Sequence, residues 1–245
     1  MDAYLKKMGL IKKNFRDEKV YVIGGLFLFI GGLIILLINY IVFIEYRDYI
    51  SRILFLSSIT TAAGLLDDIS GNKEDQGFSG HISALLCGEI TTGIFKASSI
   101  SLAVFFVLQG HILTRILDFG ILVFITNFMN LLDLRPGRSI KFFFLISWIW
   151  LVFSPEFIEY FIPVYFLLLL YLPREMNAIY MLGDSGSNLL GIILGFPVFF
   201  IPSLIFKVFI FITFLSLNLL AEKYSFTEMI AQNNVLNFID SWGRD

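Results

Sequence analysis

Long apolar runs alternate with short polar segments along the whole chain. About 20 consecutive apolar residues form a helix long enough to cross the hydrocarbon core of a bilayer, which is about 30 Å thick. The runs predict eight such helices, at about residues 20–43, 50–66, 81–108, 112–132, 141–153, 161–172, 189–206 and 208–221. The sequence therefore predicts an all-α fold, a polytopic integral membrane helical bundle with about eight transmembrane helices.

Polar segments flank this predicted transmembrane domain, residues 20–221, on both sides. Residues 1–19 are basic, and the positive-inside rule places such a segment in the cytoplasm. Most of the other Lys and Arg residues fall in loops on the same side of the eight predicted helices. Residues 222–245 form a polar tail whose spaced apolar residues suit a helix on the inner membrane surface, or else a frayed end. We expect a multi-pass protein of the cell (inner or plasma) membrane with both termini in the cytoplasm.

Composition narrows the class of protein. Hydrophobic residues make up 57% of the chain and charged residues 16%, against about 45–50% and about 25% in ordinary soluble domains. This excludes an ordinary soluble domain, and the net charge of -2 predicts no nucleic-acid partner. The single cysteine, Cys87, excludes an internal disulfide and a Cys-based metal site.

Two adjacent acids, Asp67 and Asp68, end the second apolar run. Adjacent carboxylates repel each other, and keeping both ionised at the edge of a low-dielectric region is costly unless a cation neutralises them. Mg2+ prefers oxygen ligands and is often shared between one or two protein carboxylates and the phosphates of a substrate. The alternative is a solvated acid pair that only ends a helix.

Two later polar clusters also stand at predicted helix ends. Asn127, Asn130 and Asp133 follow an i, i+3 spacing and so share one helix face. Arg135 and Arg138 come next, and their guanidinium groups either clamp phosphate oxygens or only mark the cytoplasmic side.

The third cluster lies directly before the seventh apolar run. Asp184 and Ser185 belong to a Gly-Asp-Ser-Gly-Ser sequence at a predicted helix start, where free N–H groups bind anions or metal-bound phosphates. The alternative is simple capping of the helix by one of these two side chains. Elsewhere, Glu89 and Lys96 lie two helical turns apart, as an interior ion pair or as substrate-binding groups.

The three stretches resemble one known family when taken in order. Gly64-Leu65-Leu66-Asp67-Asp68, then Asn127-x-x-Asn130-Leu131-x-Asp133, then Met181-Leu182-Gly183-Asp184-Ser185-Gly186-Ser187 are similar to the motifs of the polyprenyl-phosphate N-acetylhexosamine-1-phosphate transferases. This family includes the undecaprenyl-phosphate GlcNAc-1-phosphate transferases and the phospho-MurNAc-pentapeptide translocase. The resemblance covers roughly residues 15–206.

The resemblance implies a site and a reaction. It implies catalytic roles for Asp67, Asp68 and Asp133, substrate binding by Asn127, Asn130, Arg135, Arg138 and Ser185, and Asp184 as the ligand of a Mg2+ cofactor. The implied reaction transfers a sugar-1-phosphate from a UDP-sugar to a membrane polyprenyl phosphate for cell-envelope glycan synthesis. It yields polyprenyl-diphospho-sugar and UMP. The implied partners are the polyprenyl phosphate lipid, the UDP-sugar and the membrane, and a homodimer is compatible with the family.

The chain departs from the family pattern in two places. Asp133 is followed by Leu134-Arg135-Pro136-Gly137-Arg138 instead of a Gly-x-Asp-Gly-Leu run, and the late histidine cluster of the family is absent. These departures favour a distinct substrate. Two alternative functions remain: a catalytically inactive relative that binds lipid phosphate or nucleotide, and an ion-coupled transporter whose acids are coupling sites.

Overall fold

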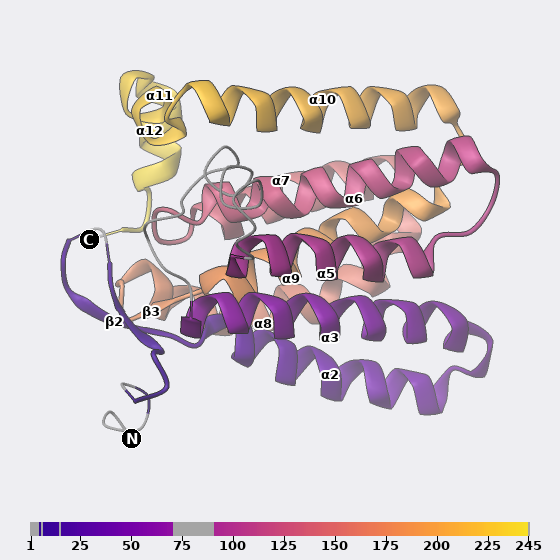
Figure 1. Cartoon of the computed structure of the whole chain (residues 1–245), viewed down its shortest axis with the longest axis horizontal. Coiled ribbons are helices and arrows are strands. Elements are labelled where there is room, and N and C mark those ends of the chain that lie inside the picture. Colours follow the sequence, from indigo (N-terminus) through magenta and orange to yellow (C-terminus); the bar gives the residue numbers. More distant parts are fainter. Residues whose placement is uncertain (1–4, 6, 15, 71–90, 245) are drawn as a thin grey trace.

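The fold is a helical bundle, described here by a computed structural model in residues 5, 7–14, 16–70 and 91–244. Figure 1 shows the long helices lying side by side, with a small sheet and both chain ends at one end of the bundle. The helices are α2 (Gly24–Val42), α3 (Arg47–Ser70), α5 (Thr92–Val107), α6 (Ile112–Leu132), α7 (Arg138–Phe153), α8 (Ile158–Met176), α9 (Gly183–Gly195), α10 (Leu204–Lys223), α11 (Phe226–Gln232) and α12 (Asn234–Ser241). Short 3-10 turns lie at Ile44–Tyr46, Pro155–Phe157 and Phe196–Phe200.

The helical bundle confirms the predicted fold class, but eight membrane spans are not confirmed. Within the described residues, five helical segments are long and apolar enough to cross a membrane: Gly24–Val42, Ile44–Ser70, Ile112–Leu132, Pro155–Met176 and Leu204–Lys223. The remaining predicted spans contain shorter helices, of 16 residues in α5 and α7 and 13 residues in α9. At 1.5 Å per residue, α9 falls well short of a bilayer core.

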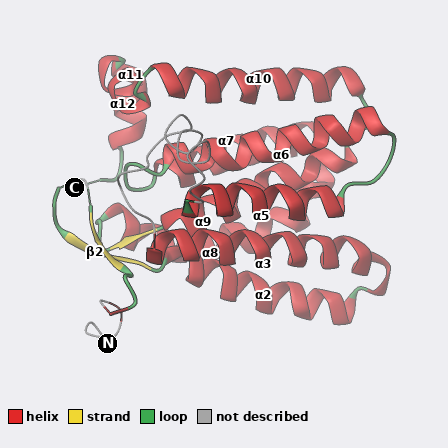
Figure 2. Ribbon diagram, viewed as in Figure 1, coloured by secondary structure: helices red, strands yellow, loops and turns green. Residues whose placement is uncertain are grey.

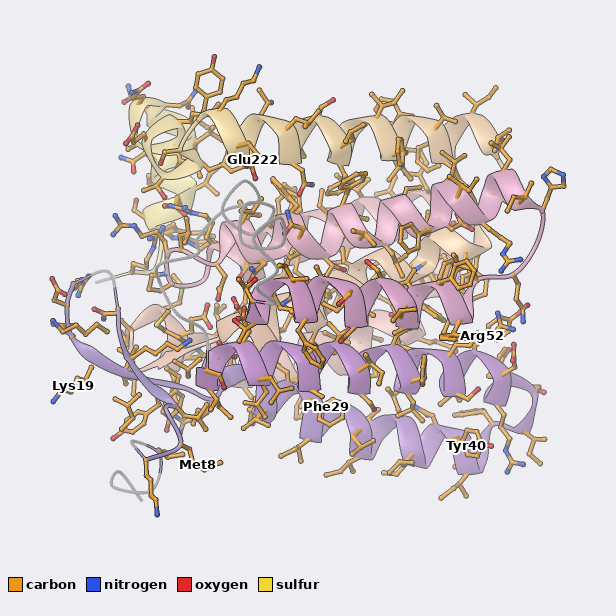
Figure 3. All side chains as sticks on the ribbon, in the orientation of Figure 1. Met8, Lys19, Phe29, Tyr40, Arg52 and Glu222 are labelled. Atoms are coloured by element: carbon orange, nitrogen blue, oxygen red, sulfur yellow. The ribbon has the colours of Figure 1, made fainter. Side chains whose placement is uncertain are left out.

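Apolar side chains cover the outside of the bundle as well as its core. Ile30, Ile34, Ile41 and Val42 of α2 are all exposed, and Figure 3 shows side chains projecting from the outer faces of α2 and α10. Large exposed apolar surfaces are uncommon on soluble monomers and mark a contact with lipid or protein. Together with the five long apolar helices, this surface indicates a membrane-embedded protein.

Helix α9 lies at the centre of the bundle. It packs against α2, α3, α6 and α7, and nearly all of its residues are buried. Two glycines permit this close packing. A Cβ atom at Gly64 of α3 would lie 2.5 Å from Ser185 Cα, and one at Gly25 of α2 would lie 2.4 Å from Gly186 N. The backbone of α9 therefore touches two neighbouring helices without intervening side chains.

A small sheet joins the N-terminal segment to the bundle. Its strands are β1 (Ile11–Lys13), β2 (Lys19–Val22) and β3 (Tyr180–Met181), in the order β1-β2-β3, and Figure 2 shows them at one end of the helices. β1 and β2 are antiparallel, whereas β2 and β3 are parallel. The sequence predicted neither strand of the hairpin, and the prediction that a helix starts near Val20 is wrong because residues 19–22 form β2.

Other predicted helix boundaries also differ. Thr91 has an extended backbone and its Oγ1 accepts a hydrogen bond from Ile94 N, so α5 begins at Thr92 rather than continuing from residue 81. Residues 81–90, with Glu89, lie outside the described part of the chain. Lys207, which falls between the predicted helices 189–206 and 208–221, lies within α10 because Ser203 caps that helix earlier.

Candidate functional site

The sequence motifs meet at the end of the bundle that carries the sheet. The C-terminal ends of α3 and α6 and the N-terminal ends of α5 and α9 come together there. Hydrogen bonds join α9 to each of the other three helices, and another joins α5 to α3. The three motifs that are far apart in the sequence are therefore neighbours in the fold.

A lysine ammonium joins the first and third motifs. Lys96 Nζ of α5 donates to Asp67 Oδ2 at 2.6 Å and to Asp184 Oδ2 at 2.8 Å. The side chain of Asp184 keeps 31% of its surface exposed, so solvent and solutes reach this carboxylate. Sequence reasoning considered Lys96 with Glu89 and missed both of these partners, because the contacts join residues that are remote in the sequence.

Asp68 serves a different purpose from its neighbour Asp67. Its carboxylate accepts hydrogen bonds from Asp184 N at 3.0 Å, Ser185 N at 3.0 Å and Ser185 Oγ at 2.8 Å. A carboxylate of α3 thus caps the first turn of α9, where free N–H groups and the helix dipole favour negative charge. The predicted alternative, capping of α9 by Asp184 or Ser185, is wrong, since the cap comes from another helix.

The second motif borders the same region from α6. Asn130 Oδ1 accepts a hydrogen bond from Ser187 Oγ of α9 at 2.8 Å, and Asp133 Oδ1 accepts one from Ser139 Oγ of α7 at 2.9 Å. Burial, together with the nearby charge of Glu175, raises the pKa of Asp133 well above its usual value. Burial and the adjacent Asp67 carboxyl raise the pKa of Asp184 to about 7. The site therefore carries less negative charge near neutral pH than its number of acids indicates.

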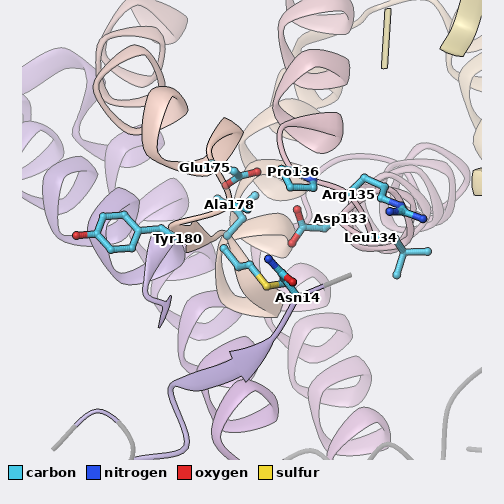
Figure 4. A pocket seen from close by; sticks show the side chains of 10 residues that line it. Asn14, Asp133, Leu134, Arg135, Pro136, Glu175, Ala178 and Tyr180 are labelled. Carbon is cyan, nitrogen blue, oxygen red and sulfur yellow. The ribbon is translucent and has the colours of Figure 1, made fainter. Parts of the chain in front are cut away.

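Some of these side chains line a pocket of about 240 Å³, which we call the acidic pocket. Its walls are formed by Lys12, Val22, Asp68, Asn130, Leu131, Asp133, Leu134, Met181, Gly183 and Asp184. A narrower hollow shares Asp133, Leu134 and Met181 with it and extends toward Arg135 and Glu175. Figure 4 shows this second hollow, with the Asp133 and Glu175 side chains on adjoining walls. The sequence pattern does not point to Glu175, and it marks Lys12 only as part of the basic segment 1–19.

Two predicted substrate-binding residues have other partners. Asn127 Nδ2 donates to Asn218 Oδ1 at 2.6 Å, which links α6 to α10 away from the acidic pocket. Arg138 is almost fully buried, and its Nε and Nη2 atoms donate to the two carboxylate oxygens of Asp240 at 2.8 and 2.9 Å. Its Nη1 atom donates to Thr227 Oγ1 at 3.1 Å, so Arg138 holds α11 and α12 against the bundle.

Ser185 and Arg135, two further predicted substrate-binding residues, have different surroundings. Ser185 is buried and its hydroxyl donates to Asp68, which gives it a structural contact within the site. Arg135 lines the narrower hollow beside Asp133.

Mg2+ requires oxygen ligands, and Asp67 and Asp184 are the carboxylates that could supply them beside the acidic pocket. Among the described residues, no group of three or more His, Cys, Asp and Glu side chains is arranged to hold a metal ion. Asp67 and Asp184 nevertheless place two carboxylate oxygens around one cation position, which the Lys96 ammonium fills. Mg2+ typically takes one or two protein carboxylates and completes its shell with water and substrate phosphates. A Mg2+ ion bound there would displace the Lys96 ammonium from between the two carboxylates and share its remaining ligands with a phosphorylated substrate.

Comparisons with protein-family models, with curated proteins and with solved structures find no match to this chain. Its own fold and site define the class: a membrane-embedded helical protein with an acidic pocket at one end of the bundle.

Proposed function

We propose that this protein is a Mg2+-dependent phosphoglycosyl transferase. It transfers a sugar-1-phosphate from a UDP-sugar to a polyprenyl phosphate in the cell membrane and supplies cell-envelope glycan synthesis. One observation carries the proposal: the Lys96 ammonium lies between Asp67 and Asp184, beside a pocket lined by Asn130 and Asp133. Acids from three separate motifs are thereby available to one substrate.

The proposed reaction is a displacement at phosphorus. An oxygen of the polyprenyl phosphate forms a bond to the β-phosphorus of the UDP-sugar, and the bond from that phosphorus to the bridging oxygen breaks. UMP leaves with the bridging oxygen, and the lipid keeps the sugar-1-phosphate as a diphosphate. Catalysis of such a transfer depends mainly on positioning and on stabilising charge at the phosphoryl oxygens.

The side chains of the site divide this work. Asp67 and Asp184 would hold the metal ion, which when bound would neutralise charge on the diphosphate. Asp68 fixes the first turn of α9 through three hydrogen bonds and so positions Asp184. Asn130 and Asp133 would orient the nucleotide and its diphosphate from the α6 side of the pocket.

The position of the pocket suits a reaction between a lipid and a soluble nucleotide. It lies at the ends of long apolar helices, where a headgroup and an aqueous substrate can meet. The N-terminal strands and the C-terminal helices lie at this same end (Figure 1). In the proposal this end faces the cytoplasm, where UDP-sugars are made available to the enzyme.

The direct test measures UMP release. The purified protein, reconstituted in lipid nanodiscs with undecaprenyl phosphate and Mg2+, is incubated with a panel of UDP-sugars, and UMP and the lipid product are quantified. The proposal expects UMP and polyprenyl-diphospho-sugar in equal amounts with at least one sugar nucleotide, and none after Mg2+ is chelated. UDP-sugar binding without UMP release across the panel would instead favour a catalytically inactive relative.

A further inference from the structure

One cation reaches the acidic pocket from outside the helical bundle. Lys12 of β1 lines the pocket, and its Nζ atom lies 3.6 Å from Asp68 Oδ1. This separation exceeds a normal hydrogen bond. The Asp68 carboxylate already accepts three hydrogen bonds from the start of α9. An ammonium has three donors, and this loose ion pair with Asp68 does not occupy them as hydrogen bonds.

The geometry of β1 explains why Lys12, and not the adjacent Lys13, lines the pocket. Side chains alternate between the two faces of a β-strand, so consecutive residues point in opposite directions. Lys13 is exposed and pairs with Asp17 at 3.3 Å on the solvent side. The chain therefore presents one lysine to the pocket and places an equivalent charge outside it.

The hairpin holds Lys12 in a fixed place relative to Asp184. Lys12 pairs with Val20 in the antiparallel ladder, and Val22 N donates to Leu10 O at 2.9 Å. Leu10 and Val20 are buried. Val22 pairs in turn with Met181 of β3, which leads directly into α9. A group held in position before the ligand arrives loses less entropy on binding.

We propose that Lys12 binds a phosphate group of the substrate in the acidic pocket. The inference rests on the proposed function and adds a positive group to a pocket whose other ionisable lining residues are Asp68, Asp133 and Asp184. Lysine is a common phosphate ligand that acts as a point charge. The phosphate belongs either to the nucleotide diphosphate or to the polyprenyl phosphate, since both carry the same oxyanion chemistry.

The test uses binding rather than turnover. UDP is titrated calorimetrically into the wild-type protein and the Lys12→Met, Lys12→Arg and Lys13→Met variants in nanodiscs with Mg2+. Loss of one charge-assisted contact should weaken UDP binding by about tenfold to a hundredfold in Lys12→Met. Lys13→Met, the matched control on the opposite face of β1, should stay within about twofold of wild type. Lys12→Arg keeps the charge and should retain most of the affinity, which separates charge loss from misfolding.

A second experiment shows whether Lys12 binds the phosphate of the nucleotide or that of the lipid. Binding of polyprenyl phosphate to the same variants is measured with lipid-loaded and lipid-free nanodiscs. If Lys12→Met weakens lipid binding and leaves UDP binding intact, Lys12 binds the lipid phosphate. Unchanged affinity for both ligands in a folded Lys12→Met protein would overturn the inference. Wild-type protein that binds UDP but releases no UMP would overturn only the proposed function, and wild-type protein that binds neither ligand would overturn both.

Discussion

Asp67 and Asp184 accept hydrogen bonds from the same ammonium group, although they belong to different helices. The Lys96 Nζ atom lies 2.6 Å from one carboxylate and 2.8 Å from the other. Two carboxylates so close to each other need a cation between them, because burial and mutual repulsion both disfavour the ionised pair. The site is therefore built around a position for positive charge.

Replacing Asp184 with Asn should abolish most of the proposed activity. The amide keeps the size of the side chain but removes the charge that would hold the metal ion. We expect UMP release to fall at least about a hundredfold, which corresponds to roughly 2.7 kcal/mol. Asp48→Asn, an exposed acid at the other end of α3, is the control and should stay within about twofold of wild type. Full activity of Asp184→Asn would remove this residue from the metal site.

Replacing Lys96 with Met should make the fold dependent on divalent ions. Without the ammonium, Asp67 and Asp184 face each other with no counter-ion. Removing one partner of a fully buried ion pair costs about 3–5 kcal/mol, and the partial exposure of Asp184 reduces this figure. The apparent melting temperature of Lys96→Met in chelator should therefore lie several degrees below wild type. Mg2+ should raise it more in the variant than in the wild type, and an equal rise in both would contradict the prediction.

Metal affinity should rise with pH up to about neutrality. The pKa of Asp184 is raised to about 7 by burial and by Asp67, so the carboxyl keeps its proton below this pH. Because the folded-state pKa is raised, the contribution of this group to stability in the absence of metal is present below its usual pKa of 3.8 and is lost as the pH rises through about 7. A metal ion needs the deprotonated form. Mn2+ affinity, followed by electron paramagnetic resonance from pH 5.5 to 8.5, should increase and then level off above pH 7, and Asp184→Asn should flatten this profile.

Breaking the contact between Arg138 and Asp240 should release the C-terminal helices and leave the chemistry largely unchanged. Hydrogen exchange of residues 226–241 should become at least about tenfold faster in Arg138→Gln, because the bidentate pair is lost. UMP release should remain within about threefold of wild type. If Arg138→Gln instead loses much of its nucleotide affinity while hydrogen exchange is unchanged, Arg138 binds substrate.

The same contact predicts acid sensitivity of the tail. Burial alone would raise the pKa of Asp240, but hydrogen bonds from Arg138 and Arg244 outweigh burial and lower it to about 2. A lowered folded-state pKa stabilises the docked tail above the ordinary value of 3.8, and this contribution is lost as the pH falls through about 2. Exchange in α12 should therefore accelerate between pH 4 and pH 2 in the wild type, with a smaller change in Asp240→Asn.

A buried ion pair between α6 and α10 should matter for stability alone. Lys207 Nζ lies 2.7 and 2.8 Å from the two carboxylate oxygens of Asp118, and both side chains are almost fully buried. Asp118→Leu leaves an unpaired ammonium in the protein interior and should cost about 3–5 kcal/mol. The double variant Asp118→Leu/Lys207→Met should recover most of this loss in denaturant titrations. Equal destabilisation by the single and the double variant would show that the pair is not the cause.

The sequence predicted the helices better than it predicted their polar contacts. Each of the eight predicted apolar regions contains a helix. A long apolar segment in lipid must pair its own backbone N–H and C=O groups, and a helix does this within one segment. The two strands of the hairpin, of three and four residues, are too short to show a periodic pattern. From the sequence, Lys12 is therefore only one of several cations before the first predicted helix.

The motifs gave the position of the candidate site but not the partner of each side chain. Asn127 and Asn130 share a helix face, yet Asn127 bonds to Asn218 on α10 and Asn130 to Ser187 on α9. Helical spacing fixes the direction of a side chain along one helix, whereas the neighbouring helix that it meets depends on packing of the whole bundle. Arg138 likewise meets Asp240, a residue near the other end of the sequence.

The first turn of α9 lies between Gly25 and Gly64, where backbone touches backbone. Even one methyl group at Gly64 would lie 2.7 Å from the Asp184 carbonyl oxygen and would push α3 and α9 apart. The distance between the Asp67 and Asp184 carboxylates around Lys96 thus depends on direct backbone contact between α3 and α9. Gly25 and Gly64 therefore set the distance between α9 and its two neighbouring helices.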